Sequence, residues 1–393
     1  MQRIFLDNHS TTPVDPRVLD AMLPYFTEHF GNAASRSHTY GWDASSAVQA
    51  ARENVAALIG AVSSKEVVFT SGATESNNLA LKGALEFLGG KRKRAIVSAI
   101  EHKSVLDTAA HLGATGFQVT VLPVNAAGTV EPDALREALS HETAIVSIML
   151  ANNEVGTVQP VAELASVAHE YGAWFHVDAA QGLGIVEFDV ERMNIDLASF
   201  SAHKIYGPKG CGALYVRSKR PRVQLSPQML GGGHEQGLRS GTLNVPAIVG
   251  FGRACELLRE EGDNDRVRIA SLRDELEARL LDALPLIRIN GNPLNRLAGN
   301  CNVSFPGIES GTLMQRLGGV AVSSGSACSS ATPEPSYVLT ALGLSPELAR
   351  CSIRFGVGRF NTQSEVLAVA KSVVSVVESL GGLHARSGAD LRL

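Results

Sequence analysis

Two charged residues that follow short apolar runs suggest the chemistry of this chain. Lys204 lies in the segment SFSAHKIYGPKGCG (199–212), between a strand-like pattern and a glycine-rich turn. A lysine amine held beside His203 at a pocket mouth can lose its proton and attack a carbonyl carbon. Asp178 closes another strand-like pattern, WFHVD. An amine and a carboxylate that face one cleft would suit pyridoxal phosphate, which needs a lysine imine and an acidic partner for its ring nitrogen. Taken alone, the pair is also consistent with a surface lysine and a helix-capping aspartate.

A second segment, VVFTSGATESNN (67–78), reads as strand, glycine turn and helix. The backbone N–H groups of Gly72, Ala73 and Thr74 would be free at the helix start, where the helix dipole favours a phosphate. Serine and threonine also favour ordinary helix starts, so an unliganded cap explains the segment about as well. No G-x-G-x-x-G opens a helix and no G-x-x-x-x-G-K-[ST] occurs, which argues against dinucleotides and nucleoside triphosphates.

His102, in AIEHKSV, follows a predicted strand and has an imidazole that titrates near neutral pH. It could stack on an aromatic cofactor and move protons, or it could be a structural histidine. Its neighbour Lys103 is an alternative imine-forming residue, ranked below Lys204 because Lys204 lies with a histidine between a strand and a glycine turn. His176 and Asp178 share one strand face, but two ligands without a third at a companion spacing argue against a metal.

Cys328 lies in GGVAVSSGSACSSATP (318–333), a stretch made almost entirely of small residues. A buried cysteine is usually a small apolar core residue, and this interpretation suits Cys255 and Cys301 better. A thiol on a flexible segment is what a sulfur carrier needs. Arg354, in SIRFGVGR, is a candidate clamp for a substrate carboxylate because guanidinium can make two parallel hydrogen bonds; an exposed strand arginine is the alternative.

The elements that must position these residues alternate between strands and helices, which predicts βαβ units and a mostly parallel sheet. The predicted strands are 66–69, 95–99, 117–124, 144–149, 174–177, 197–200 and 213–216. The predicted helices are 75–85, 104–111, 132–139 and 161–171. In such sheets the ligand lies beyond the carboxyl ends of the strands, where residues 70–74, His102, Asn153, Asp178 and Lys204 all fall.

Composition sets the broad class of the protein. The 393 residues are 45% hydrophobic and 19% charged, with a net charge of −4, so neither nucleic acid nor an anionic membrane is an expected partner. Five cysteines without a C-x-x-C argue against a disulfide framework or a zinc site. No signal peptide and no apolar run of about 18 residues are present, which favours a cytoplasmic protein.

The polar stretch EEGDNDR (260–266) interrupts the alternating pattern and predicts a domain boundary. We expect a large domain over 15–260. The smaller α+β domain would comprise 1–14 and 261–393, with a helix over 269–284 and strands near 287–289, 302–305 and 352–355.

Taken together, these motifs resemble the cysteine desulfurases, fold-type I pyridoxal phosphate enzymes of the class V aminotransferase superfamily. The resemblance runs from about Phe5 to Arg359 and is strongest to the housekeeping group that supplies sulfur for iron–sulfur cluster assembly. The motifs that carry it, in family order, are LDNHSTTPVDPRV, FTSGATESNN, EHKSV, ANNEVGTVQP, HVDAAQ, FSAHKIYGPKG, GGGHEQGLRSGT, SSGSACSSATPEPSYVL and SIRFGVGRF. The resemblance implies an α/β fold in which a large domain with a mostly parallel seven-stranded sheet is joined to the smaller domain.

The resemblance also implies roles for individual residues. Lys204 would form the imine, Asp178 would pair with the pyridine nitrogen, and His102 would stack on the ring and act as acid and base. The further roles fall to Gln181 at the phenolic oxygen, Ala73, Thr74, Ser201 and His203 at the phosphate, Thr242 at the phosphate of the other subunit of a homodimer, and Asn153 and Arg354 at the substrate carboxylate.

Cys328 would take sulfur from L-cysteine as a persulfide, leaving alanine, on a mobile loop of about 319–335. It could also ligate a cluster transiently; no resident metal is expected. The sulfur would pass to an iron–sulfur scaffold protein or another acceptor, and no direct contact with nucleic acid is expected. The chain departs from the family's commonest wording at Asn8-His9-Ser10, at Ala202 and in a short tail after Leu380.

Two alternatives remain open from the sequence. A transaminase on the same scaffold would explain Lys204 and Asp178 but would leave Cys328 without a task. A catalytically inactive homologue that serves as a binding subunit would carry no cofactor.

Overall fold

A seven-stranded sheet forms the larger part of the computed structural model, which describes residues 3–219, 221–324 and 334–381. The spatial order is β2-β8-β7-β6-β5-β3-β4, and all strands run parallel except β8, which is antiparallel to both neighbours. Each strand overlaps one of the predicted strands, so the α/β fold with a mostly parallel sheet is confirmed. The bounds are β2 (Val67–Thr70), β3 (Arg94–Ser98), β4 (Gln118–Leu122), β5 (Thr143–Ser147), β6 (Trp174–Asp178), β7 (Leu197–Ser201) and β8 (Gly212–Val216).

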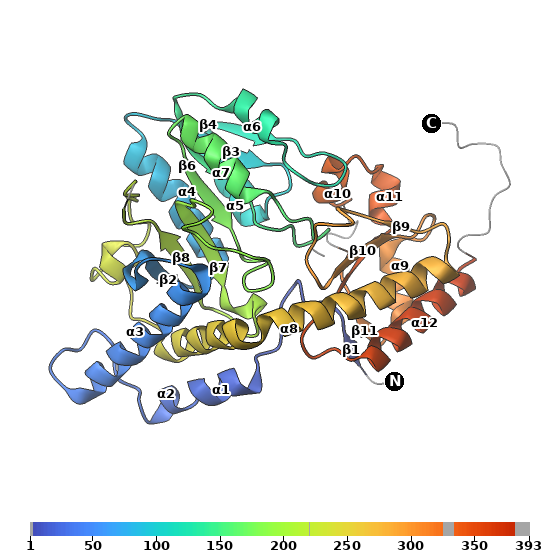
Figure 1. The fold of residues 1–393 in the computed structure, drawn as a ribbon, viewed down its shortest axis with the longest axis horizontal. Helices are drawn as coiled ribbons and strands as arrows, with labels where there is room; N and C mark the ends of the chain where they lie inside the picture. The colour runs from blue at the N-terminus through green and yellow to red at the C-terminus, as the bar shows by residue number, and fades with distance from the viewer. Residues whose placement is uncertain (1–2, 220, 325–333, 382–393) are drawn as a thin grey trace.

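Helices cover both faces of this sheet, which explains why its central strands are apolar on both sides (Figure 1). One face packs on α4 (Ala73–Leu88) and α5 (Lys103–Ala114). The other face packs on a larger core to which four helices contribute most of the helical residues. These are α1 (Pro16–Met22), α3 (Thr39–Ile59), α7 (Val161–Glu170) and the first half of α8 (Val245–Ala283), while α2 (Pro24–Thr27) and α6 (Pro132–Ala138) lie at the periphery and α6 adds Leu135 to the core.

A second α+β unit has its own core. Its antiparallel sheet has the order β12-β10-β9, and a parallel pair joins β1 to β11 beside it. The strands are β1 (Ile4–Phe5), β9 (Arg288–Ile289), β10 (Asn300–Ser304), β11 (Val320–Ala321) and β12 (Ser352–Gly356). The helices are α9 (Ser310–Leu317), α10 (Tyr337–Ala341), α11 (Pro346–Arg350) and α12 (Gln363–Ser379).

The prediction of a separate helix over 269–284 is wrong, because α8 continues for 39 residues through the polar stretch and beneath both cores (Figure 1). Its apolar residues up to Leu258 belong to the large core, and those from Ile269 belong to the second core. Between them most polar side chains are exposed, whereas Asp265 pairs with Arg359 at 2.6 Å. Gly262 is buried, and a Cβ added there would lie 3.0 Å from the Gly184 carbonyl oxygen. The two-domain division therefore stays a prediction, with its boundary inside α8. None of the described helices combines the length and apolar character of a membrane span.

Candidate active site

A cavity of about 710 Å³ lies where the strands of the large sheet end, and the N-terminal segment and β12 close its opposite side. Ten of the predicted site residues line it: Ala73, Thr74, His102, Asn153, Asp178, Gln181, Ser201, His203, Lys204 and Arg354. Thr242 does not; it lies on an exposed loop. Cys328 lies outside the described residues.

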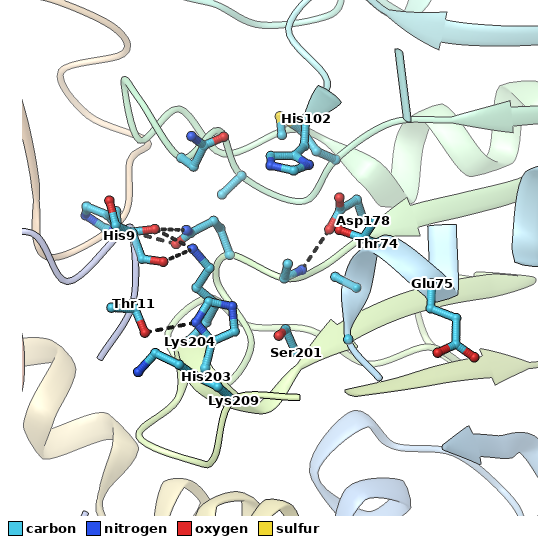
Figure 2. A pocket seen from close by; sticks show the side chains of 18 of the residues that line it. His9, Thr11, Thr74, Glu75, His102, Asp178, Ser201, His203, Lys204 and Lys209 are labelled. Carbon is cyan, nitrogen blue, oxygen red and sulfur yellow. Dashed lines mark hydrogen bonds between the residues drawn. The ribbon is translucent and has the colours of Figure 1, made fainter. Parts of the chain in front are cut away.

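Lys204 follows β7 on a short 3-10 turn, η2 (Ala202–Lys204), which turns its side chain into the cavity (Figure 2). Its Nζ donates to the backbone carbonyls of His9 (2.6 Å) and Ser10 (2.8 Å). Burial and the positive charge of Arg354 lower the pKa of the amine to about 8, although Asp178 and Asp7 oppose the shift. The amine is therefore much closer to deprotonation at neutral pH than an exposed lysine.

Asp178 ends β6 and is almost fully buried. Its Oδ2 accepts from Asn77 Nδ2 (2.7 Å) and its Oδ1 from the Ala180 N–H (3.0 Å). Asn77 Nδ2 also donates to Ser104 Oγ, which lies 2.9 Å from His102 Nδ1. A hydrogen-bonded chain thus connects the buried carboxylate to the imidazole.

The His102 ring caps α5, because its Nδ1 accepts the Ser104 N–H at 3.1 Å. That acceptor role places the ring hydrogen of neutral His102 on Nε2. The Asn77 and Ser104 side chains were not predicted as site residues. The motif FTSGATESNN contains Asn77, but its link to Ser104 joins residues far apart in sequence and leaves no periodic signal.

The start of α4 forms the end of the cavity next to Asp178 in Figure 2. Gly72, its N-cap, has φ +153°, a conformation that glycine adopts readily, and the first N–H groups of any helix lack intrahelical acceptors. Ser201 and His203 line the same cavity from the end of β7. Burial, with Lys204 and Lys209, lowers the pKa of His203 to about 4, so this ring is neutral and its Nδ1 lies 3.0 Å from Thr11 Oγ1.

Arg354 projects from β12 toward the same cavity. Its guanidinium donates to Asp7 Oδ1 (2.7 Å), Ser10 Oγ (2.7 Å) and the Asn153 carbonyl (2.8 Å). The Nε of Arg354 is buried and has no hydrogen-bond partner among the described residues. The positive guanidinium as a whole is suited to a ligand carboxylate.

Two alternatives from the sequence fail on geometry. Lys103 does not line the cavity; its Nζ lies 4.9 Å from the centre of the Tyr337 ring. His176 is buried between Ser147 Oγ (2.7 Å) and Ser199 Oγ (2.9 Å), and burial lowers its pKa to about 3. Within the described residues no group of three or more histidine, cysteine or acidic side chains could hold a metal ion.

Comparison with known proteins places this arrangement in context. The model of the aminotransferase class-V family matches residues 4–369. The chain is 57% identical over 363 residues to a protein named cysteine desulfurase IscS from Anaeromyxobacter dehalogenans, covering 92% of this chain and 89% of that one. A solved NifS-like protein superposes with a TM-score of 0.89 at 37% identity, covering 96% of this chain and all of the other. A structure described as SspA in complex with cysteine gives a TM-score of 0.80 at 37% identity, covering 91% of this chain and all of that one.

Proposed function

The chain belongs to the aminotransferase class-V family, and on that premise we propose that it is a cysteine desulfurase. It takes sulfur from L-cysteine, releases L-alanine and holds the sulfur on Cys328. The observation that supports this most strongly is the placement of the Lys204 amine, the Asp178 carboxylate and the Arg354 guanidinium around one cavity. A relative solved in complex with cysteine supports the choice of substrate.

The residues around the cavity fit pyridoxal phosphate. The start of α4 and Ser201 would hold the phosphate, and His203, being neutral, can donate to it from Nε2. Asp178 would face the pyridine nitrogen, and Lys204 would hold the cofactor covalently. When bound, pyridoxal phosphate supplies an aromatic system that accepts the electron pair of a substrate carbanion.

The substrate carboxylate would bind at Arg354 and Asn153. The Arg354 side chain lines the cavity, and Asp7 holds the guanidinium plane in place. With the carboxylate fixed on this side, the substrate Cα lies toward Lys204, whose amine, with its pKa lowered to about 8, takes the Cα proton and returns it.

Sulfur transfer depends on Cys328 as the nucleophile. An unperturbed thiol has a pKa of about 8.5, so it needs a base at neutral pH. We assign this role to His102, which lines the cavity. An S–S bond forms between Cys328 Sγ and the substrate sulfur while the substrate C–S bond breaks. The sulfur is oxidised to the sulfane level, and the electron pair of the broken bond stays with carbon, which takes up a proton on the way to alanine.

Partners follow from the same proposal. The persulfide would pass to an iron–sulfur scaffold protein or to another sulfur acceptor, including one for transfer RNA thiolation, in the cytoplasm. The enzyme would act as a homodimer in which Thr242, on its exposed loop, reaches the phosphate of the second subunit. Exposed aromatic side chains near α2 and the start of α3 offer an apolar surface for that contact: Phe26, Phe30, Tyr40 and Trp42.

The test measures alanine and sulfide formed from L-cysteine by the purified protein in the presence of a thiol reductant. Equal amounts of both products are expected, and Cys328→Ser should retain the cofactor absorbance while losing persulfide and turnover. Amino-group transfer to an oxoacid without sulfide would identify a transaminase instead. A protein that takes up no cofactor would contradict the proposal altogether.

A further inference from the structure

His9 connects the two residues that would flank the reacting end of the cofactor. Its backbone carbonyl accepts hydrogen bonds from Lys204 Nζ (2.6 Å) and from Gln181 Nε2 (2.8 Å). Its ring Nδ1 lies 3.2 Å from Gln181 Oε1. One residue of the N-terminal segment therefore contacts both the lysine after β7 and the glutamine after β6.

These contacts fix which way the Gln181 amide faces. The backbone carbonyl of His9 can only accept, so the Gln181 atom beside it must be the NH₂ group. The carbonyl Oε1 then faces the His9 ring, and Nδ1 must carry the ring hydrogen in order to donate to it. Gln181 lines the cavity, and its second N–H has no partner among the residues that the structure describes.

The surroundings keep the His9 ring neutral. Burial comes first, and the charges of Arg354 and Lys204 add to it, lowering the pKa of His9 to about 3 despite its hydrogen bond to Gln181 and the nearby Gly299 carbonyl. The second ring nitrogen, Nε2, is buried without a hydrogen-bond partner among the described residues. In the Nδ1–H tautomer this nitrogen carries a lone pair and no hydrogen.

We propose that His9 is a positioning residue that sets the Gln181 amide to offer an N–H, rather than a carbonyl, to the phenolic oxygen of the cofactor. This inference rests on the proposed function, because it requires pyridoxal phosphate in the cavity. The backbone carbonyl of the same residue holds Lys204 beside that point, so His9 couples the orientation of the amide to the position of the amine.

The donor function can be separated from the space that the side chain fills. Asparagine places an amide N–H near the position of histidine Nδ1, whereas leucine has almost the same shape as asparagine and no donor. In His9→Leu the backbone carbonyl of residue 9 still accepts from Gln181 Nε2, but Gln181 Oε1 loses its donor, so only one end of the amide is held. His9→Asn should therefore preserve the amide orientation and His9→Leu should weaken it. Gln181 itself remains unchanged in both variants.

The experiment measures dissociation constants of the apoenzymes for pyridoxal phosphate and for its 3-deoxy analogue, which lacks the phenolic oxygen. The unaltered protein and His9→Asn should prefer pyridoxal phosphate by about tenfold, the value of one hydrogen bond to a charged oxygen. His9→Leu should reduce this preference to about twofold or less. The cofactor bound to His9→Leu should also change colour at a pH at least about half a unit higher than in the unaltered protein, because the ionised phenol loses a hydrogen-bond donor.

Each outcome is decisive. If both variants keep the preference for pyridoxal phosphate, His9 does not position the amide, although the cofactor site stands. If the unaltered apoenzyme binds neither compound, the proposed function fails first. Should His9→Leu not fold, nitrogen-15 NMR of the unaltered protein with labelled histidine decides the question: the Nδ1–H tautomer supports the proposal, and the Nε2–H tautomer overturns it.

Discussion

At the scale of single residues, the sequence offered two lysines that could form the imine, and their positions in the structure select one of them. Lys204 projects into the cavity and Lys103 packs on Tyr337. Both follow the end of a strand, so the sequence distinguished them only through the neighbouring His203 and the glycine turn. The difference in surroundings gives two measurable consequences.

Lys204→Ala should abolish covalent attachment of the cofactor and lower desulfurase turnover by roughly 10²- to 10⁴-fold, the range for loss of a positioned acid–base group. Lys103→Ala serves as the matched control and should leave both unchanged. Borohydride reduction followed by peptide mapping checks the result. Label on a peptide containing Lys103 would refute the assignment.

The rate at which the apoenzyme takes up pyridoxal phosphate should rise with pH through a midpoint near 8. Only the deprotonated amine reacts, and the pKa of Lys204 is lowered to about 8 from 10.5. Because Arg354 contributes to that lowering, Arg354→Gln should move the midpoint to higher pH. Stopped-flow absorbance over pH 6 to 11 measures both profiles, and an unchanged midpoint in the variant would exclude the electrostatic explanation.

At the scale of elements, the close contact between β8 and the turn before α4 determines the shape of the proposed phosphate site. A Cβ at Gly212 would collide with the Phe200 carbonyl and would lie 2.6 Å from Gly72 Cα. Neither neighbour is a flexible side chain, so the backbone would have to shift. The glycine at 212 therefore allows Gly72 to approach.

Gly212→Ala should lower the free energy of unfolding by about 1–3 kcal/mol and weaken binding of pyridoxal phosphate, because the displaced backbone carries the phosphate donors. Gly311→Ala, at a helical glycine with open space around it, should have little effect. Urea unfolding and cofactor titration measure the two quantities. Equal behaviour of the two variants would show that the contact is unimportant.

Element type and the polar ends of strands could be predicted from the sequence, because buried parallel strands are short and apolar and the residue after each one is polar. Asp178 and Lys204 were found in this way. The course of α8 was missed because a polar segment reads as a break, whereas Gly262 packs closely and most of the flanking charges stay exposed. The contacts of His9 were missed because they join residues 195 positions apart, as in its bond to Lys204.

At the scale of the whole molecule, two exposed aromatic side chains in the N-terminal part of the chain lie next to each other. Phe30 is 65% exposed, and its ring centre lies 5.4 Å from that of Tyr40. Exposed aromatic side chains that lie next to each other are typical of protein interfaces.

Phe30→Glu should therefore convert the proposed homodimer to monomer, because a buried unpaired charge opposes association. Leu294→Glu is the matched control. Leu294 is 95% exposed on the second unit, and its substitution should leave the protein dimeric, with an unchanged molecular mass in solution. Size-exclusion chromatography with light scattering distinguishes one chain from two. A Phe30→Glu protein that stays dimeric would place the interface elsewhere.

The unbroken course of α8 has a consequence for cooperativity. Neither core is complete without its half of this helix. If one core unfolds, its half of α8 loses its packing, and the helix begins to unwind toward the other core. Calorimetry should accordingly show a single heat-absorption peak for the apoprotein, and occupation of the cleft should move that peak to higher temperature without splitting it. Two resolved peaks would mean that the helix divides in the middle after all, where Gly262 lies.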